Sequence, residues 1–182
     1  MIVLASGSPR RKALLEPFYR LTVAPVPIDE TPREGEAALP YALRMAREKC
    51  RGEGDFVLSA DTVVHREGEL FNKPRDPEHA VWMLNRLSGQ SHQVTTAFAL
   101  NGRAEAVTTQ VVFRGFTDAE ARAYVATGEP LDKAGAYGIQ GIGGFLVARI
   151  DGSYSNVVGL PLAEVIAAIT IAGGPAPFES RT

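Results

Sequence analysis

The chain has 182 residues, 45% of them hydrophobic, and its 19 Lys and Arg nearly balance its 21 Asp and Glu to give a formal net charge of −2. This balance argues against a general nucleic-acid binder, so no stable binding of nucleic acid is expected. The single cysteine excludes an internal disulfide and indicates a reducing compartment, the cytoplasm. No apolar run approaches the ~20 residues that cross a bilayer, and the first residues do not resemble a signal peptide, so no membrane association is expected.

The first predicted elements are a buried strand over residues 2–5 and a helix over 9–18, with Ser8 as the N-cap and Pro9 at the first helical position. The first turn of this helix carries three consecutive cations, at residues 10–12. A helix N-terminus carries the positive end of the helix dipole, which favours acidic residues there. Such a break of a local rule tends to mark a functional site.

An anion would resolve this conflict. Exposed backbone N–H groups, the hydroxyls of Ser6 and Ser8, and the cations Arg10 and Arg11 together make a candidate phosphate site. The alternative is an ordinary basic turn on a solvated surface helix, and the segment alone leaves both open. The segment is not a P-loop, because the required glycine and lysine spacing is missing.

Acidic residues follow in two extended segments. Residues 21–28 lead into Glu30, and Asp61 lies in a strand predicted over 56–58 and 63–64 with a break at 59–62. A carboxylate within a buried strand is rare unless it is paired or binds a metal. Backbone N–H groups at a bulge could also satisfy it. Together, Glu30 and Asp61 offer oxygen ligands for Mg²⁺ or Mn²⁺.

Two lysines are further candidates for the phosphate site. Lys49 lies on a helix predicted over 40–51, and Lys73 lies in an exposed loop before the next helix. Each would be an ordinary surface lysine if the first loop held no phosphate. If it does, cations on neighbouring elements complete the binding site.

The remaining elements alternate along the chain. We expect, in order, a short strand at 70–71, a helix over 77–88, a hairpin of 92–100 and 104–116, a helix over 117–128, a glycine-rich loop over 129–144, a strand over 145–150 and a last helix over 161–172. The last helix is apolar on nearly all sides, which predicts that it is packed inside. The pattern predicts one α/β or mixed α+β domain over 1–172 with a central mixed sheet flanked by helices, and a loose tail over 173–182.

The glycine-rich loop contains the third informative stretch, residues 132–141. Its small residues would let a flat ligand approach the backbone. The glycines at 141–144 precede a strand and do not open a helix, which excludes a dinucleotide fingerprint. The three histidines lack metal-ligand spacing, so a zinc site is not expected.

Taken together, these segments resemble the Maf family of nucleotide pyrophosphatases. The matching motifs are LASGSPRRKALL from Leu4, SADTVV from Ser59, NKPRD from Asn72, LSG from Leu87, GEPLDKAGAYGIQG from Gly128 and SNVVGLPL from Ser155. The resemblance implies a fold related to that of the inosine-triphosphate pyrophosphatases, with a twisted mixed sheet and a substrate cleft. It also implies hydrolysis of a nucleoside triphosphate to the monophosphate and pyrophosphate, with a divalent metal such as Mg²⁺ or Mn²⁺.

The resemblance assigns roles residue by residue. Asp61 matches the proton acceptor, and the positions of base selection are Arg10, Thr62 and Gln140. The expected phosphate-binding residues are Ser6, Arg11, Lys49 and Lys73, beside Arg10, and the expected metal ligands are Glu30 and Asp61. The combination of SADT with YGIQG resembles the branch that acts on dTTP and UTP.

The chemistry of Gln140 supports this branch, because a carboxamide offers both a donor and an acceptor to the edge of uracil or thymine. Gln140 could instead brace the loop backbone. Two other functions stay open at this point: a pyrophosphatase for methylated or noncanonical purine nucleotides, and a nucleotide-sensing regulator of cell division without turnover. The resemblance also suggests a homodimer, although no exposed apolar stripe in the sequence marks an interface.

Overall fold

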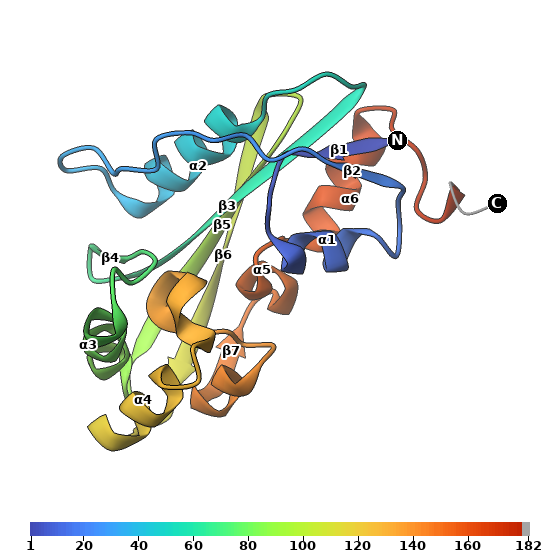
Figure 1. The fold of residues 1–182 in the computed structure, drawn as a ribbon. Coiled ribbons are helices and arrows are strands. Elements are labelled where there is room, and N and C mark those ends of the chain that lie inside the picture. The colour runs from blue at the N-terminus through green and yellow to red at the C-terminus, as the bar shows by residue number, and fades with distance from the viewer. Residues whose placement is uncertain (180–182) are drawn as a thin grey trace. The chain divides into compact units, whose positions relative to one another are not determined.

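The structure is a computed structural model that describes residues 1–179, and within them the chain forms two compact units. Unit 1 consists of Met1–Thr62, Thr96–Val107 and the chain from Gly159 onward, and unit 2 of Val63–Thr95 and Thr108–Val158. In chain order the elements are β1 (Ile2–Leu4), α1 (Pro9–Leu15), β2 (Leu21–Val23), α2 (Ala38–Lys49), β3 (Phe56–Arg66), β4 (Glu69–Phe71), α3 (Pro77–Leu87), β5 (Ser91–Leu100), β6 (Arg103–Phe113), α4 (Asp118–Val125), the 3₁₀ helices η1 (Glu129–Asp132), η2 (Ala134–Ala136) and η3 (Ile142–Leu146), β7 (Val147–Asp151), α5 (Tyr154–Val158) and α6 (Leu162–Ile171) (Figure 1).

The strands form a mixed sheet, which confirms the predicted fold class. The strand order is β2-β1-β3-β5-β6-β7, and β4 pairs with β3. Strand β1 pairs parallel with β2 and β3, whereas the pairs β3–β4 and β6–β7 are antiparallel. Strands β3, β5 and β6 contribute residues to both units.

The core of unit 1 lies between the parallel strands and the helices α1 and α6, which lie beside β1 and β2 in Figure 1. Leu4 and Leu58 belong to one buried cluster with Val165 and Ile169 of α6. The prediction that the last helix is packed inside holds for one face only: Val165 and Ile169 are buried, and Leu162, Ile166 and Ala168 are partly buried against the same cluster. Ile171, at its end, is 80% exposed.

Strand β3 is continuous where the sequence predicted a break. Its eleven residues run through Asp61 without interruption, and residues 57–61 are all buried. Strand β1 pairs with β3 only as far as Leu58, and the neighbouring strand β5 lies on the other side of β3 in the sheet. Tertiary pairing therefore overrides the weak strand preference of Ser, Ala and Asp.

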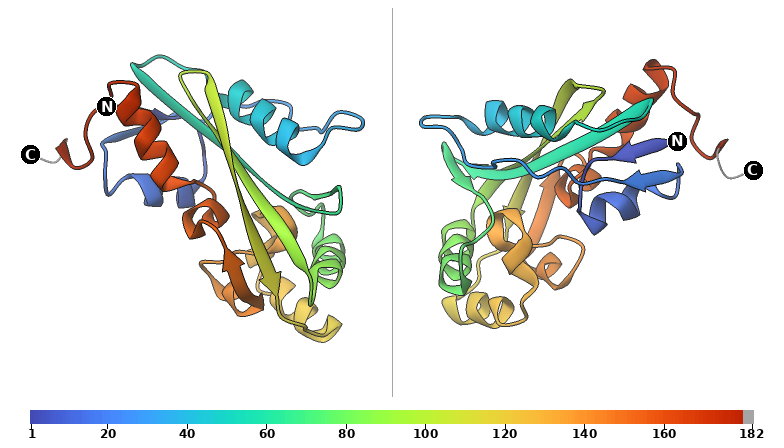
Figure 2. Two further views of the ribbon diagram at one scale, coloured as in Figure 1. Left: turned by 180° about the vertical axis from the view of Figure 1, so that it is seen from behind. Right: turned by 45° about the horizontal axis from the view of Figure 1, so that its top comes forward.

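Unit 2 has a core of its own, formed by residues of β3 to β6 together with α3 and α4. These two helices lie side by side in both views of Figure 2. Their predicted starts are confirmed: the Asp76 side chain accepts from the N–H of His79, and Thr117 and Glu120 form a capping box. The loop expected over 129–144 contains three short 3₁₀ helices, and α5 had no counterpart among the predicted elements.

The segment after α6 makes specific contacts within unit 1. The N–H of Phe178 donates to the carbonyl of Phe18 at 2.9 Å, and the two rings lie 5.2 Å apart. Residues 180–182 of the expected tail lie outside the described residues. Among the helices of residues 1–179, none has the length and apolar character needed to span a membrane.

Candidate active site

The start of α1 has the local structure that the sequence predicted. The Ser8 hydroxyl caps the helix by accepting from the N–H of Arg11 at 3.5 Å, Pro9 stands in the first turn, and that turn contains no acidic residue. Ser6 is buried, and its hydroxyl accepts from the N–H of Ser8 at 3.3 Å. The hydroxyls of Ser6 and Ser8 thus fix the backbone of the segment that leads into α1.

Arg11 connects three separate segments of unit 1. Its Nε donates to the carbonyl of Gly159 at 2.8 Å, Nη1 to Ser6 Oγ at 3.0 Å and Nη2 to Thr62 Oγ1 at 3.1 Å. Burial lowers the pKa of Arg11, and the negative charges of Asp61 and Glu30 oppose that shift while Arg10 adds to it. The role of Arg11 in phosphate binding stays a prediction, whereas its hydrogen bonds to Ser6, Thr62 and Gly159 are present in the fold.

Thr62 lies at the end of this chain of contacts. Its hydroxyl lies 3.1 Å from Nη2 of Arg11 and 2.9 Å from the hydroxyl of Thr96 on β5. A role for Thr62 and Arg10 in base selection stays a prediction.

Asp61 is paired on its strand by Lys49, at the end of α2. The Nζ atom of Lys49 lies 2.7 Å from Asp61 Oδ1 and 2.7 Å from Glu30 Oε1. The side chains of Lys49 and Asp61 are each 12% exposed, whereas that of Glu30 is 46% exposed. Two carboxylates therefore meet at one ammonium, which satisfies the buried acid that the sequence marked as unusual.

The register of the parallel strands explains this position. Leu4 of β1 pairs with Leu58, and the N–H of Ala5 donates to the carbonyl of Leu58 at 2.7 Å, after which β1 ends and β3 continues. Asp61 and Thr62 therefore lie beyond the carboxyl end of β1. Ligands of open α/β sheets bind at this edge of the parallel strands.

Successive side chains of β3 point to opposite faces of the sheet, so neighbouring residues contact different helices. Ser59 and Asp61 contact α2, at the carbonyl of Ala46 and at Lys49, whereas Thr62 contacts Arg11 of α1. The structure thus brings together two groups of predicted residues in unit 1: Glu30, Lys49 and Asp61, and Ser6, Arg11 and Thr62.

Two predicted site residues belong to unit 2, Lys73 after β4 and Gln140 between η2 and η3, and both are exposed. Among residues 1–179, the carboxamide of Gln140 makes no hydrogen bond. This observation gives no support to the alternative in which Gln140 braces its own loop.

Sequence reasoning missed Glu129, which organises that loop. Its carboxylate accepts from the N–H groups of Ile142 and Gly143 and from the hydroxyl of Tyr124. Glu129 stands in the motif GEPLDKAGAYGIQG ahead of a run of glycines, but this pattern does not reveal that the chain folds back onto its carboxylate.

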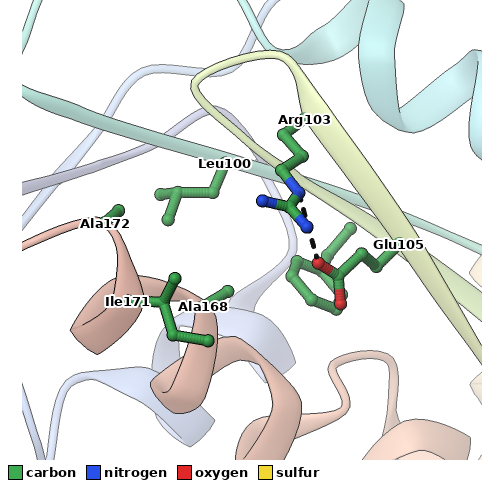
Figure 3. Close-up of a pocket in the computed structure, with 7 residues that line it drawn as sticks. Leu100, Arg103, Glu105, Ala168, Ile171 and Ala172 are labelled. Carbon is green, nitrogen blue, oxygen red and sulfur yellow. Dashed lines mark ion pairs between the residues drawn. The ribbon is translucent and has the colours of Figure 1, made fainter.

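One cavity of unit 1, of about 80 Å³, has none of the predicted site residues in its lining (Figure 3). It is lined by Phe98, Leu100, Arg103, Glu105, Ala168, Ile171 and Ala172. Its one cation, Arg103, lies 3.7 Å from the carboxylate of Glu105, so the cavity lacks the unpaired positive charge that a triphosphate would need.

Known families and proteins similar to this chain indicate where it belongs. A family described as Maf-like protein matches residues 1–171. A protein of Myxococcus xanthus (strain DK1622) named dTTP/UTP pyrophosphatase is 53% identical and covers 99% of this chain and 96% of its own length. A protein of the same name in Anaeromyxobacter sp. (strain Fw109-5) is 50% identical and covers 98% of this chain and 93% of its own length. Another in Escherichia coli O157:H7 is 51% identical and covers 90% of this chain and 88% of its own length. With one family matched across both units and relatives this similar over nearly the whole length, the chain belongs to the family of Maf-like proteins.

Proposed function

We propose that this protein is a nucleoside triphosphate pyrophosphatase that hydrolyses dTTP, UTP and modified pyrimidine analogues. Water attacks the α-phosphate, the bond between the α- and β-phosphates breaks, and the products are the nucleoside monophosphate and pyrophosphate. The name dTTP/UTP pyrophosphatase of relatives at 50–53% identity supports this reaction.

The observation that carries the proposal is the position of Asp61 in unit 1. It lies just beyond the carboxyl end of β1, and its charge acts on Arg11 of the cationic helix start. An acid and a cluster of cations at this edge of a parallel sheet suit a bound polyphosphate attacked by water.

The triphosphate is proposed to bind Ser6, Arg10 and Arg11, with Lys49 and Lys73 as further cations. Arg11 already makes three hydrogen bonds in the protein. A guanidinium has five N–H groups, so two are left for phosphate oxygens. In this proposal Arg11 shapes the site and binds substrate at the same time.

Asp61 is proposed to accept the proton of the attacking water. Lys49 contacts Oδ1 of Asp61, so we assign the proton to Oδ2. Free aspartate is a weak base at neutral pH, so correct positioning of the water has to supply most of the acceleration.

A divalent cation, Mg²⁺ or Mn²⁺, fits the proposed site. Glu30 and Asp61 both contact one positive group, the Lys49 ammonium, and this convergence supports the proposal that both carboxylates face a bound cation. Within residues 1–179 no cluster of three or more His, Cys, Asp or Glu could hold a metal, so phosphate oxygens and water would complete the ligands. A bound cation would neutralise charge on the phosphates.

Base selection is proposed to depend on Gln140, together with Arg10 and Thr62. The exposed carboxamide of Gln140 can donate to a carbonyl and accept from the N3–H of uracil or thymine. A pyrimidine would satisfy both halves of this group, whereas a guanine edge presents adjacent donors to it.

The test is pyrophosphate release from dTTP, UTP, CTP, GTP, ITP and 7-methyl-GTP, each with Mg²⁺ or Mn²⁺. We expect dTTP and UTP to exceed the purine nucleotides in kcat/KM by at least roughly tenfold, and EDTA to stop the reaction. A preference for 7-methyl-GTP or ITP would overturn the base assignment. Tight binding of dTTP with no product would overturn the enzyme and favour the sensor.

The homodimer and the cytoplasmic location stay proposals from the sequence. The location is supported by the single cysteine. Sedimentation of the purified protein would test the dimer, with a single species of about 39 kDa, twice the chain's 19.5 kDa, expected.

A further inference from the structure

The loop that carries Gln140 is held by one carboxylate of unit 2. Oε1 of Glu129 accepts from the hydroxyl of Tyr124 at 2.7 Å and from the N–H of Gly143 at 2.9 Å, and Oε2 accepts from the N–H of Ile142 at 2.8 Å. Burial raises the pKa of Glu129, but these hydrogen bonds outweigh burial and the net effect lowers the pKa. The ionised carboxylate is thus the form that the loop binds.

The glycines of the loop are required by this carboxylate. A Cβ atom at Gly141 would collide with the carboxylate of Glu129, and one at Gly143 would collide with the hydroxyl of Tyr124. The absence of side chains at these two positions therefore lets the backbone approach Glu129 closely. Packing within the protein therefore explains why glycine occupies positions 141 and 143, without a contact to a ligand.

The contacts of Glu129 and Tyr124 also fix the backbone that precedes Gln140 in the chain. The Tyr124 hydroxyl, which donates to Glu129, also accepts from the N–H of Gly138 at 3.2 Å. The backbone is therefore fixed two residues before Gln140 and again two residues after it, at Ile142. Between these fixed points the Gln140 side chain is exposed and makes no hydrogen bond within residues 1–179.

We propose that Glu129 is a positioning residue for base selection, which presents the Gln140 carboxamide in one orientation to the base. This inference rests on the proposed function. Glu129 does not touch the substrate in this proposal. It acts by fixing the backbone on both sides of Gln140. The carboxamide of Gln140 can donate and accept hydrogen bonds in one direction only if the backbone that carries it is rigid.

The test is the variant Glu129→Gln, which keeps the size of the side chain and removes its charge. An amide has a single acceptor oxygen and turns an NH₂ group toward the donors of the loop. We expect the ratio of kcat/KM for dTTP over GTP to fall roughly tenfold, mainly through a higher KM for dTTP. We also expect faster hydrogen exchange at the amides of Ile142 and Gly143.

A second variant, Tyr124→Phe, keeps the ring and removes the hydroxyl that links Glu129 to Gly138. It should shift the same ratio in the same direction by a smaller factor, and it decides the case if Glu129→Gln does not fold. The matched control is Glu69→Gln, which breaks a Glu69–Arg86 ion pair of 3.0 Å elsewhere in unit 2 and should leave the ratio unchanged.

The outcomes separate this inference from the function on which it rests. If the unaltered protein hydrolyses dTTP selectively and both variants keep that selectivity, the role of Glu129 is overturned while the proposed function stands. If exchange at Ile142 and Gly143 accelerates without a change in selectivity, Glu129 only stabilises the loop and the role is overturned as well. If the unaltered protein hydrolyses no pyrimidine nucleotide, both are overturned.

Discussion

The ammonium of Lys49 lies 2.7 Å from Oδ1 of Asp61, on a strand whose residues 57–61 are buried. The same ammonium contacts Glu30, so one cation holds two carboxylates from different segments of unit 1. The bridge explains how a charged acid is tolerated within β3. It also fixes the direction in which the acid points.

Replacement of Asp61 by Asn tests the proposed proton acceptor. The amide keeps the shape of the side chain but does not accept a proton at neutral pH, so we expect pyrophosphate release from dTTP to fall by at least roughly 100-fold. Asp55→Asn, at an exposed position of unit 1, is the control and should retain full turnover. Near-normal turnover of Asp61→Asn would remove Asp61 from the mechanism.

Replacement of Lys49 by Met tests the bridge as a source of stability. The variant leaves the carboxylates of Asp61 and Glu30 facing each other without a cation, and we expect the free energy of unfolding in urea to fall by roughly 1–3 kcal/mol. The control is Lys12→Met, which removes an exposed pair with Glu16 at 3.7 Å and should cost less than about 0.5 kcal/mol. Equal losses in the two variants would contradict the bridge.

Replacement of Gln140 by Glu tests base recognition directly. A carboxylate cannot donate a hydrogen bond, so a pyrimidine carbonyl loses its partner, and we expect kcat/KM for dTTP and UTP to fall by roughly 10- to 100-fold. Gln93→Glu, at an exposed position on β5, adds the same charge elsewhere in unit 2. An unchanged ranking across the nucleotide panel would mean that Gln140 does not read the base.

His92 predicts a pH dependence of stability. Burial lowers its pKa from 6.5 to about 3, with smaller contributions from the charges of His65 and Arg66. Since the unfolded chain binds this proton and the folded chain does not, stability is lost as the pH falls from 6.5 toward about 3, by at most about 1.4 kcal/mol per pH unit.

The variant His92→Gln should flatten that part of the curve of unfolding free energy against pH. The control is His79→Gln, on α3, where the ring accepts from the N–H of Arg75, and the slope of the unaltered protein should persist. A slope that survives in His92→Gln would assign the effect to another group.

Gly143 predicts a packing effect in the loop. A methyl group there would meet the Tyr124 hydroxyl and also the carbonyl oxygen of Gly138 at 2.8 Å, so Gly143→Ala should lower the free energy of unfolding by roughly 1–3 kcal/mol. At Gly115 no atom lies within 4 Å of an added Cβ, and Gly115→Ala should change stability by less than about 1 kcal/mol. Thermal unfolding of the two variants compares them, and equal melting temperatures would contradict the close contact.

Elements that depend on a few adjacent residues were predicted well. The helices predicted to begin at 77 and 117 and the hairpin predicted from 92–100 and 104–116 are all present. Each of the two helix starts is fixed by side-chain hydrogen bonds between residues three positions apart. The break predicted in β3 is absent, and α6 is buried along one face and not on all sides. Both depend on which segments lie next to these elements, and local preference does not contain that information.

The amino-acid sequence by itself determined the cationic start of α1, the lone acid on β3 and the resemblance that names their roles. Only the tertiary structure decided that Lys49 joins Asp61 to Glu30, that Arg11 ties Ser6 to Thr62, and that Glu129 holds the loop around Gln140. The physical reason is the range of the interactions. Helix caps and turns form between neighbours in the chain, whereas an ion pair or a carboxylate that binds a distant loop forms only after folding has brought its partners within about 3 Å.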